Sequence, residues 1–208
     1  MVEGKRAYRS ALRAEQAERT RVAVIAAAAE CFVEKGYAET TMKDIAARAG
    51  VSAPTVYAQG AKAELLLAAV DQSLVGDAAP ESLRERDWFR RLLEERDKKE
   101  KLRLLREIAL NRPPMSGEIM RAFREAAPGD PEIGEAWEEY QRRRYADMRV
   151  LVESFAHLLR PGLTVERAAD VFWAVFDEQT TEVLLGRGWT LTECVDWMID
   201  GMDRLLLH

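Results

Sequence analysis

The stretch GYAETTMKDIAARAGVSAPTVYAQ, residues 36–59, describes two short helices joined by a turn that contains a glycine. Thr40 or Thr41 can cap the first helix, because a threonine oxygen accepts a free N–H group of the first turn. Gly50 follows the last apolar turn, where a left-handed backbone costs little for glycine. Ser52 is the candidate cap of the second helix. This order of cap, glycine and cap predicts a helix-turn-helix.

The outer face of the second helix is polar or small, and Val56 is its strongly apolar member. A helical hairpin inside a bundle, the alternative, would carry apolar residues on this face. Val51 supplies an apolar plug for the turn, so caps, glycine, plug and polar helix agree with one another. We therefore favour a helix that reads DNA. Its outward residues are Ser52, Ala53, Thr55, Tyr57, Ala58 and Gln59.

The residues around this motif extend the pattern. The series C-F-V-E-K-G-Y-x-x-T-T-M-x-D-I-A-x-x-A-G-V-S-x-x-T-V-Y, residues 31–57, closely resembles the N-terminal domain of the TetR (tetracycline-repressor) family of transcriptional regulators. The resemblance covers residues 18–70. It implies an all-α fold, with a three-helix DNA-binding domain in residues 1–63, called the head below. A helical ligand-binding and dimerisation domain would follow in residues 64–208.

The resemblance also implies which residues contact DNA. Thr41, Tyr57 and Lys62 match family positions that hold phosphates. We expect Ser52, Ala53, Thr55 and Gln59 to face base edges. Gln59 is a plausible reader of adenine, because its amide can both donate and accept. The complete predicted DNA-binding set is Thr40, Thr41, Lys43, Ser52, Ala53, Thr55, Tyr57, Gln59 and Lys62.

One departure from the family pattern lies directly after Tyr57. The family usually has a phenylalanine three residues after this tyrosine, then a turn of small residues and a lysine. Here residues 58–62 read AQGAK, so the phenylalanine is missing and the connection is one residue shorter. We expect Gly60 to lie in a turn. We also expect Leu65 or Leu66 to pack against Val56 or Tyr57 in place of the missing ring.

Charge is distributed unevenly along the chain. The net charge is −5, yet residues 1–63 carry ten Lys/Arg against seven acidic residues, so the head is +3 and the remainder −8. A positive head on a negative body orients the head toward DNA. The basic arm, with Lys5, Arg6, Arg9 and Arg13, either extends the DNA contact into a minor groove or forms a disordered tail.

The second part of the chain lacks period-two alternation and reads as helices throughout. Glycine and proline mark its breaks, for example at residues 112–114 and 161–162. The predicted helices are 63–75, 80–96, 98–111, 115–126, 131–160, 164–186 and 191–207.

All five tryptophans lie in this second part, together with most phenylalanines and methionines. Such residues are either simple core or the lining of an apolar cavity, and the resemblance implies a small-molecule pocket. The polar residues 177–182 could orient a ligand, line an interface or face solvent. The predicted contacts of a largely apolar ligand are Trp88, Met120, Phe123, Trp137 and Phe176.

Helices 131–160 and 164–186 are the expected dimerisation surface, because an apolar stripe on the latter is wider than one core contact requires. A two-fold dimer matches palindromic DNA. The implied function is a ligand-responsive transcriptional regulator, a repressor, that binds operator DNA as a homodimer. The stripe comprises Ala168, Val171, Phe172, Val175, Phe176, Gln179 and Val183.

Other classes of protein have less support. The chain has two histidines, no nucleophile elbow, no phosphate-binding glycine loop and no metal-type spacing, so we expect no enzyme, cofactor or metal. Cys31 and Cys194 read as small buried residues in a reducing compartment. No apolar run approaches ~20 residues and no signal peptide is evident, which favours the cytoplasm. The remaining alternative is a ligand-sensing or structural helical dimer with a degenerate head.

Overall fold

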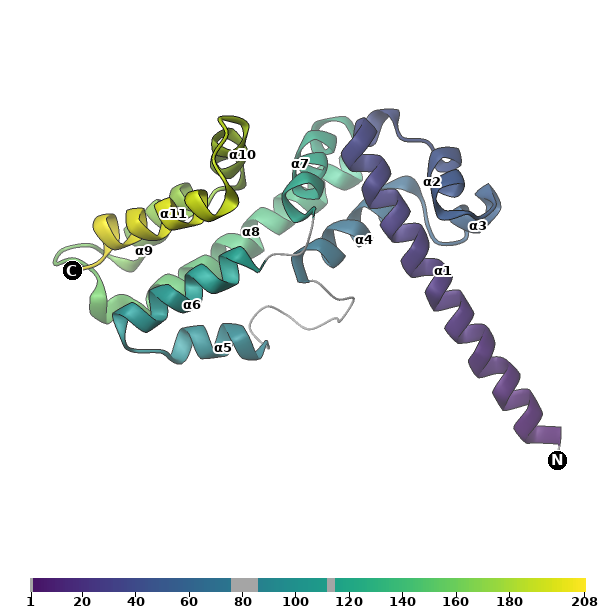
Figure 1. Ribbon diagram of the computed structural model, residues 1–208, viewed down its shortest axis with the longest axis horizontal. Coiled ribbons are helices and arrows are strands. Elements are labelled where there is room, and N and C mark those ends of the chain that lie inside the picture. The colour runs from purple at the N-terminus through teal and green to yellow at the C-terminus, as the bar shows by residue number, and fades with distance from the viewer. Residues whose placement is uncertain (1, 76–85, 112–114) are drawn as a thin grey trace. The chain divides into compact units, whose positions relative to one another are not determined.

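The computed structural model describes residues 2–75, 86–111 and 115–208, and the regular elements in these ranges are helices (Figure 1). The predicted all-α class is therefore confirmed. The chain divides into two compact units. Unit 1 comprises Met1–Ser73 with Glu118–Trp137, and unit 2 comprises Leu74–Gly117 with Glu138–His208. Unit 1 thus includes residues beyond 63, and the functional boundary between residues 63 and 64 stays a prediction.

Unit 1 is built on a long first helix, against which α2 packs, and α3 packs in turn on α2 (Figure 1). The backbone of residues 2–14 continues this first helix, so the arm is helical, whereas its contact with DNA stays a prediction. The helices are α1 (Val2–Glu39), α2 (Met42–Ala49), α3 (Ala53–Tyr57), α4 (Lys62–Val75), most of α7 (Ser116–Ala126) and the start of α8 (Pro131–Glu153).

The helix-turn-helix forms through the caps that the sequence predicts. Of the two candidate threonines, Thr41 caps α2: its Oγ1 accepts from the Asp44 backbone N at 3.1 Å. The Asp44 carboxylate accepts from the Thr41 backbone N at 2.9 Å, which completes a capping box. Gly50 ends α2 with a φ of 66°, and the Ser52 side chain caps α3. The turn is thus fixed by local hydrogen bonds.

Small residues let α1 lie close to its neighbours. Its buried face includes Ala27, Ala28 and Cys31, beside the larger Phe32. Cys31 and Cys194 are both buried and free, as expected, and burial raises the pKa of the Cys31 thiol. None of the described helices is both long and apolar enough to cross a membrane.

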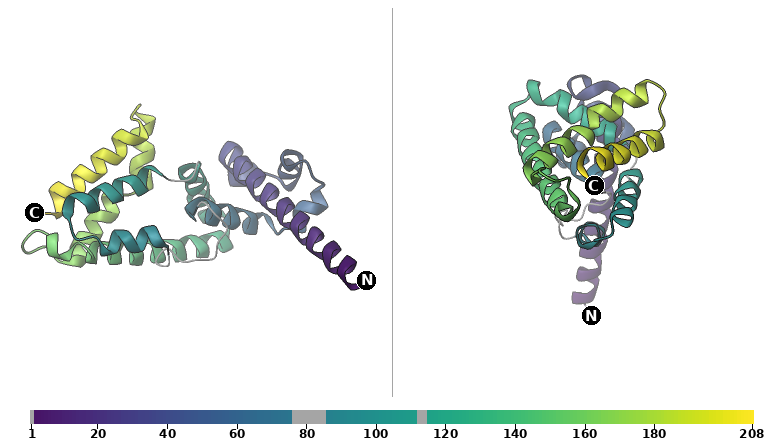
Figure 2. Two further views of the ribbon diagram at one scale, coloured as in Figure 1. Left: turned by 60° about the horizontal axis from the view of Figure 1, so that its bottom comes forward. Right: turned by 90° about the vertical axis from the view of Figure 1, so that its left-hand side faces the viewer.

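Unit 2 has an apolar core to which most of its helices contribute. The last helix, α11, packs against α6 and α9 (Figure 2). Fully buried members of this core include Leu92, Phe155 and Met202. The helices are α5 (Asp87–Glu94), α6 (Lys98–Leu110), the remainder of α8, α9 (Val165–Val175), α10 (Glu178–Gly186) and α11 (Leu191–Leu206).

Three predicted helices differ from the observed ones. The predicted helix 164–186 is two helices, α9 and α10, because the Asp177 carboxylate takes the backbone N–H of Thr180 at 3.3 Å. In a continuous helix that N–H would bond to the carbonyl of Phe176. The predicted helix 131–160 ends at Glu153, and the predicted helix 80–96 is observed as Asp87–Glu94, with residues 80–85 outside the described ranges.

Most residues of the predicted dimerisation stripe pack inside the core of unit 2 instead. Ala168, Phe172 and Phe176 are buried in its core, and Val171 and Val175 pack against them. Their burial inside one chain removes them from a surface that a second chain could contact. Val183 differs, because 53% of its surface is exposed.

One buried residue of unit 2 is a lysine. Lys101 is 0% exposed, and its Nζ donates to the carbonyl oxygens of Leu93 (3.2 Å), Glu95 (3.0 Å) and Ser154 (2.9 Å). Burial lowers the pKa of Lys101 to about 8. The ring of Phe155 lies 4.6 Å from the same nitrogen. One ammonium group therefore satisfies three carbonyls from the end of α5 and the end of α8.

We expect Lys101→Ala to lower the free energy of unfolding by about 3 kcal/mol, because it leaves three buried carbonyls without a donor. Urea unfolding followed by circular dichroism measures this. Lys99→Ala, at an exposed position of the same helix, is the control and should change the value by less than about 0.5 kcal/mol. Equal stability of the two variants would contradict a clamping role for Lys101.

Candidate nucleic-acid interface

The helix α3 presents a polar outer surface. Val56 is 0% exposed and anchors the helix inward, whereas Tyr57 is 64% exposed. Ser52 and Ala58 are exposed as well, and Ala53, Thr55 and Gln59 are half-buried. The Ser52 and Thr55 hydroxyls lie 2.7 Å apart and share a hydrogen bond. The residues that sequence analysis assigned to base edges therefore lie on α3 or directly beside its two ends.

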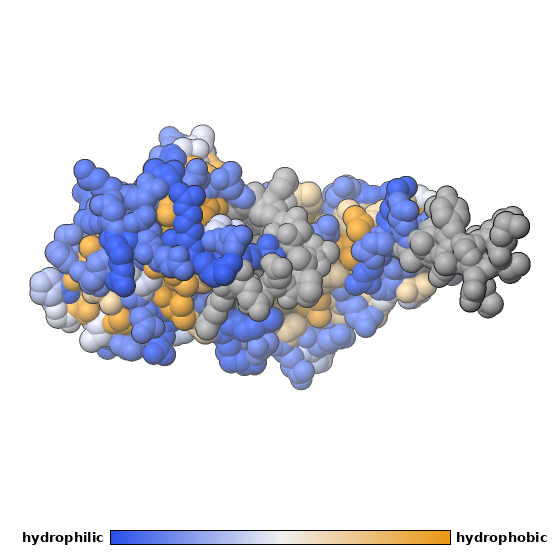
Figure 3. Space-filling model, turned by 90° about the horizontal axis from the view of Figure 1, so that it is seen from below, coloured by the Kyte–Doolittle hydropathy of each residue, from blue (hydrophilic) through white to orange (hydrophobic). Residues whose placement is uncertain are grey.

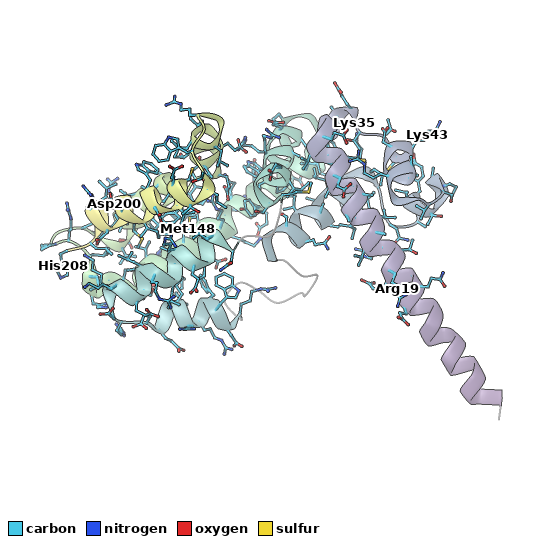
Figure 4. All side chains as sticks on the ribbon, in the orientation of Figure 1. Arg19, Lys35, Lys43, Met148, Asp200 and His208 are labelled. Carbon is cyan, nitrogen blue, oxygen red and sulfur yellow. The ribbon has the colours of Figure 1, made fainter. Side chains whose placement is uncertain are left out.

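The start of α2 adds two exposed candidates, Thr41 and Lys43 (Figure 4). The Thr41 hydroxyl donates to the Asp44 carboxylate at 2.6 Å. Because this bond uses the hydroxyl hydrogen, Thr41 can meet a phosphate only by giving it up. Lys43 is the more accessible cation for such a contact.

Thr40 does not lie on this surface, and its assignment to the DNA-binding set is wrong. Its side chain is buried, with 1% of the residue exposed. The hydroxyl donates toward the carbonyl oxygens of Cys31 (3.0 Å) and Gly36 (2.7 Å). Thr40 therefore satisfies carbonyls at the end of α1 and cannot reach a phosphate.

Lys62 is half-buried and bonded within the head. Its Nζ donates to the carbonyl oxygens of Tyr37 at 2.9 Å and Thr40 at 3.2 Å. The same nitrogen lies 4.3 Å from the centre of the Tyr37 ring, a cation–π distance. These two bonds use two of the three N–H groups of the ammonium. A phosphate contact through the third stays a prediction.

Ion pairs hold α2 against α1. Lys35 Nζ lies 2.7 Å from Asp44 Oδ1 (Figure 4 labels Lys35), and Arg48 pairs with Glu30 and Glu34. The hydrogen bond from Lys35 keeps the pKa of Asp44 well below its usual range. The capping carboxylate of α2 therefore stays ionised at neutral pH.

The short connection between α3 and α4 contains the expected glycine turn. The Gly60 backbone N donates to the Tyr57 carbonyl at 3.3 Å, with a φ of 141°. A Cβ at this position would lie 2.7 Å from Glu64 Oε2, the oxygen that accepts from the Ala61 backbone N. Leu65 is buried, as are Leu66 and Val56, but a direct contact of a leucine with Val56 or Tyr57 stays a prediction.

The predicted ligand contacts are divided between the units. Met120, Phe123 and Trp137 belong to unit 1, where the rings of Phe123 and Trp137 meet edge to face at 5.2 Å. In unit 2, Phe176 stacks on Phe172 at 4.3 Å, and Trp88 on α5 is 40% exposed. Ligand contact by these five residues stays a prediction.

The polar segment 177–182 is partly occupied by structural bonds that sequence analysis missed. Arg144 on α8 donates to the Phe176 carbonyl at 2.7 Å and pairs with Glu178 at 3.1 Å. Its guanidinium lies 4.6 Å from the ring of Trp173. Arg144 thus supplies the donor that the carbonyl loses where α9 ends. A single arginine in a charged helix gives no sequence signal for this role.

Comparison with known proteins agrees with the geometry of the head. Residues 24–69 match the profile of the family described as "Bacterial regulatory proteins, tetR family". The chain is 29% identical to "Probable HTH-type transcriptional regulator ArpR" of Pseudomonas putida, over 93% of this chain and 94% of that protein. Residues 24–69 therefore carry a TetR-family domain, and the chain as a whole is similar to an HTH-type transcriptional regulator.

Solved structures share the fold of this chain. NalD, the secondary repressor of the MexAB-OprM multidrug efflux pump in Pseudomonas aeruginosa, is 25% identical with a TM-score of 0.67, over 92% of this chain and 98% of NalD. A transcriptional regulator from Saccharomonospora viridis, solved with choline, has a TM-score of 0.71 at 19% identity, over 92% of this chain and 99% of that one. At this identity the second likeness shows the fold alone.

We expect Lys62→Met to lower the free energy of unfolding by about 1–2 kcal/mol, because the thioether cannot donate to the Tyr37 and Thr40 carbonyls. Lys43→Ala, at an exposed position, should change it by less than about 0.5 kcal/mol. Urea unfolding of both variants measures the difference. If Lys62→Met were as stable as the parent chain, the hydrogen bonds from Lys62 to the Tyr37 and Thr40 carbonyls would contribute nothing to the free energy of unfolding.

Proposed function

We propose that this chain is a TetR-family regulator, a ligand-responsive repressor that binds palindromic operator DNA as a homodimer. The observation that carries the proposal is the orientation of α3, which buries Val56 and leaves Tyr57 64% exposed beside hydroxyl and amide side chains. A helix in the interior of a bundle would cover a large aromatic residue. A recognition helix leaves its polar face free for the major groove.

Within this proposal the contacts divide into two classes. Lys43, Tyr57 and Lys62 hold phosphates, which positions the head without reading sequence. Ser52, Thr55 and Gln59 face base edges, where hydroxyl and amide groups discriminate between base pairs. Thr40 and Thr41 serve the structure of the head: the first satisfies carbonyls of α1 and the second caps α2.

Exposed apolar residues on α10 and α11 support a homodimer. Scattered apolar residues are usual on a protein surface, and on the face in Figure 3 they form separate areas among hydrophilic ones. A denser set lies in the last part of unit 2, and a second copy would remove it from water. A two-fold axis would then present two α3 helices to one palindrome. This set comprises Val183 (53% exposed), Leu185 (43%), Trp189 (38%), Leu191 (38%), Trp197 (43%) and Leu205 (53%).

Small-molecule control is supported by the aromatic and methionine residues of the second part and by the similar proteins. NalD is a repressor of a multidrug efflux pump, and the regulator from Saccharomonospora viridis was solved with choline. A ligand can move a two-state equilibrium only if it binds one state more tightly. We place the largely apolar ligand at Trp88, Met120, Phe123, Trp137 and Phe176, with α4 carrying the change to the head.

Selection of binding sites from random duplexes tests the proposal. The parent chain should enrich a palindrome whose half-sites lie about 34–36 Å apart or a multiple of this. Gln59→Ala should weaken binding to the enriched duplex and leave random duplexes unaffected. Lys43→Ala should weaken binding to both alike and lower the salt slope by about one.

Enrichment of no sequence would overturn the proposal and favour the degenerate-head alternative. The two variants serve as controls for each other, because one tests sequence reading and the other tests charge. An unchanged salt slope in Lys43→Ala would remove Lys43 from the phosphate contacts. Loss of random-duplex binding in Gln59→Ala would show that the variant had disturbed the head as a whole.

The ligand part of the proposal predicts a link between tryptophan fluorescence and operator binding. Choline and a panel of small apolar compounds can be titrated against the chain. A compound that quenches fluorescence by binding should also lower affinity for the enriched duplex, because it favours the other state. Trp137→Phe should reduce both effects, whereas Trp173→Phe, which lies outside the proposed ligand contacts and the exposed apolar set, should keep them.

If quenching saturates while operator affinity stays constant, the compound binds the chain but does not regulate its DNA binding. Equal behaviour of the two tryptophan variants would remove Trp137 from the ligand site. Analytical ultracentrifugation of the same samples shows whether a loss of operator affinity on ligand binding comes from dissociation of the dimer or from a change within an intact dimer.

A further inference from the structure

The end of α1 is tied to a residue far away in the chain. The Tyr37 hydroxyl donates to Asp130 Oδ2 at 2.9 Å, and both residues belong to unit 1. Tyr37 follows Gly36, whose φ of 79° bends the end of α1. Asp130 immediately precedes α8. The hydrogen bond therefore joins the end of the helix that supports the helix-turn-helix to the start of the longest helix that follows it.

Asp130 is held on its other side by α8. Its Oδ1 accepts from the backbone N of Glu132 at 3.1 Å, and its carbonyl accepts from the Gly134 backbone N at 2.8 Å. The hydrogen bond from Tyr37, with smaller contributions from backbone N–H groups, lowers the pKa of Asp130, so the acceptor is charged at neutral pH. A bond to a charged acceptor is stronger than one between neutral groups. The Asp130 carboxylate is consequently held in a fixed position relative to the first turn of α8.

Tyr37 in turn contacts Lys62, the first residue of α4. The Lys62 ammonium lies over its ring and donates to its carbonyl, and it also donates to the carbonyl of Thr40. Thr40 is the residue directly before Thr41, the cap of α2. We call Asp130, Tyr37 and Lys62 the latch. The latch connects the start of α8 with the points at which α2 and α4 begin.

We propose that Asp130 and Tyr37 are positioning residues for DNA recognition, although neither lies on the α2–α3 surface. The latch fixes where α2 begins, so a movement of α8 changes how the base-reading residues of α3 are presented. This route acts beside the connection through α4. The inference rests on the proposed function, because its readout is sequence-specific DNA binding.

Tyr37→Phe tests the latch, because it removes the hydroxyl and keeps the ring beneath Lys62. The matched control is Tyr145→Phe in unit 2, where the hydroxyl donates to Asp170 Oδ1 at 2.8 Å. Fluorescence anisotropy gives the affinity of each variant for the duplex enriched by the parent chain and for a random duplex. Tyr37→Phe should lower operator affinity about tenfold, the effect of losing one charge-assisted hydrogen bond. Its affinity for random duplexes should stay within about twofold, because the phosphate contacts remain.

Two further variants separate positioning from general stability. Asp130→Asn keeps a hydrogen-bonding partner and a good helix cap, so it should retain most of the operator affinity. Asp130→Ala should lose it, and the double variant Tyr37→Phe with Asp130→Ala should be no weaker than Asp130→Ala alone. Urea unfolding of all variants, Tyr145→Phe included, shows whether the folded fraction differs.

Equal operator affinity of Tyr37→Phe and Tyr145→Phe would overturn the inference, as would a parallel loss on operator and random duplexes. Additive losses in the double variant would also contradict it, because the two residues would then act separately. If the parent chain enriches no sequence, the proposed function fails first and the latch loses its role with it. A parent chain that enriches an operator while Tyr37→Phe binds it normally leaves the proposed function intact and removes the latch alone.

Discussion

The carbonyl groups at the end of α1 need hydrogen-bond donors from outside that helix, and the arrangement of the head follows from how they obtain them. Gly36, with a φ of 79°, interrupts the helical backbone near the end of α1. The Thr40 hydroxyl donates to the carbonyls of Cys31 and Gly36, and Lys62, at the start of α4, donates to those of Tyr37 and Thr40. These hydrogen bonds fix the chain at the end of α1, and they leave Thr41 in position to cap α2. Positive charge at a helix C-terminus is also favoured by the helix dipole.

Unit 2 solves the same problem with two other cations. Lys101 donates to carbonyls at the end of α5 and just after α8, and Arg144 donates to the carbonyl where α9 stops. The two differ in their partners. Arg144 pairs with Glu178, whereas the polar partners of Lys101 are three carbonyl oxygens. In both units, cations from distant parts of the chain donate to carbonyl groups at helix ends.

Features that depend on neighbouring residues could be predicted from the sequence. The caps at Thr41 and Ser52 and the glycine at position 50 are local signals, and they gave the helix-turn-helix and the exposed face of α3 correctly. Features that depend on distant donors could not. The burial of Thr40 depends on the bend at Gly36, so sequence analysis placed this residue on the surface. The donor Arg144, 32 residues from Phe176, was missed as well, whereas the cap at Asp177 before α10 is a local signal that sequence analysis did not use. The partner of Tyr37 lies 93 residues away, with no pattern to announce it.

The short connection between α3 and α4 leaves little room for a change in its length. Gly60 bonds back to Tyr57 while Ala61 bonds forward to Glu64, so each residue of the connection already serves one of the two helices. Inserting one residue to regain the length usual in the family would separate these two sets of bonds. Substitutions of Ala58 or Gln59 leave both sets of bonds in place, because backbone groups and the Glu64 carboxylate make them. A change in length, by contrast, alters the end of α3 and the start of α4 at once.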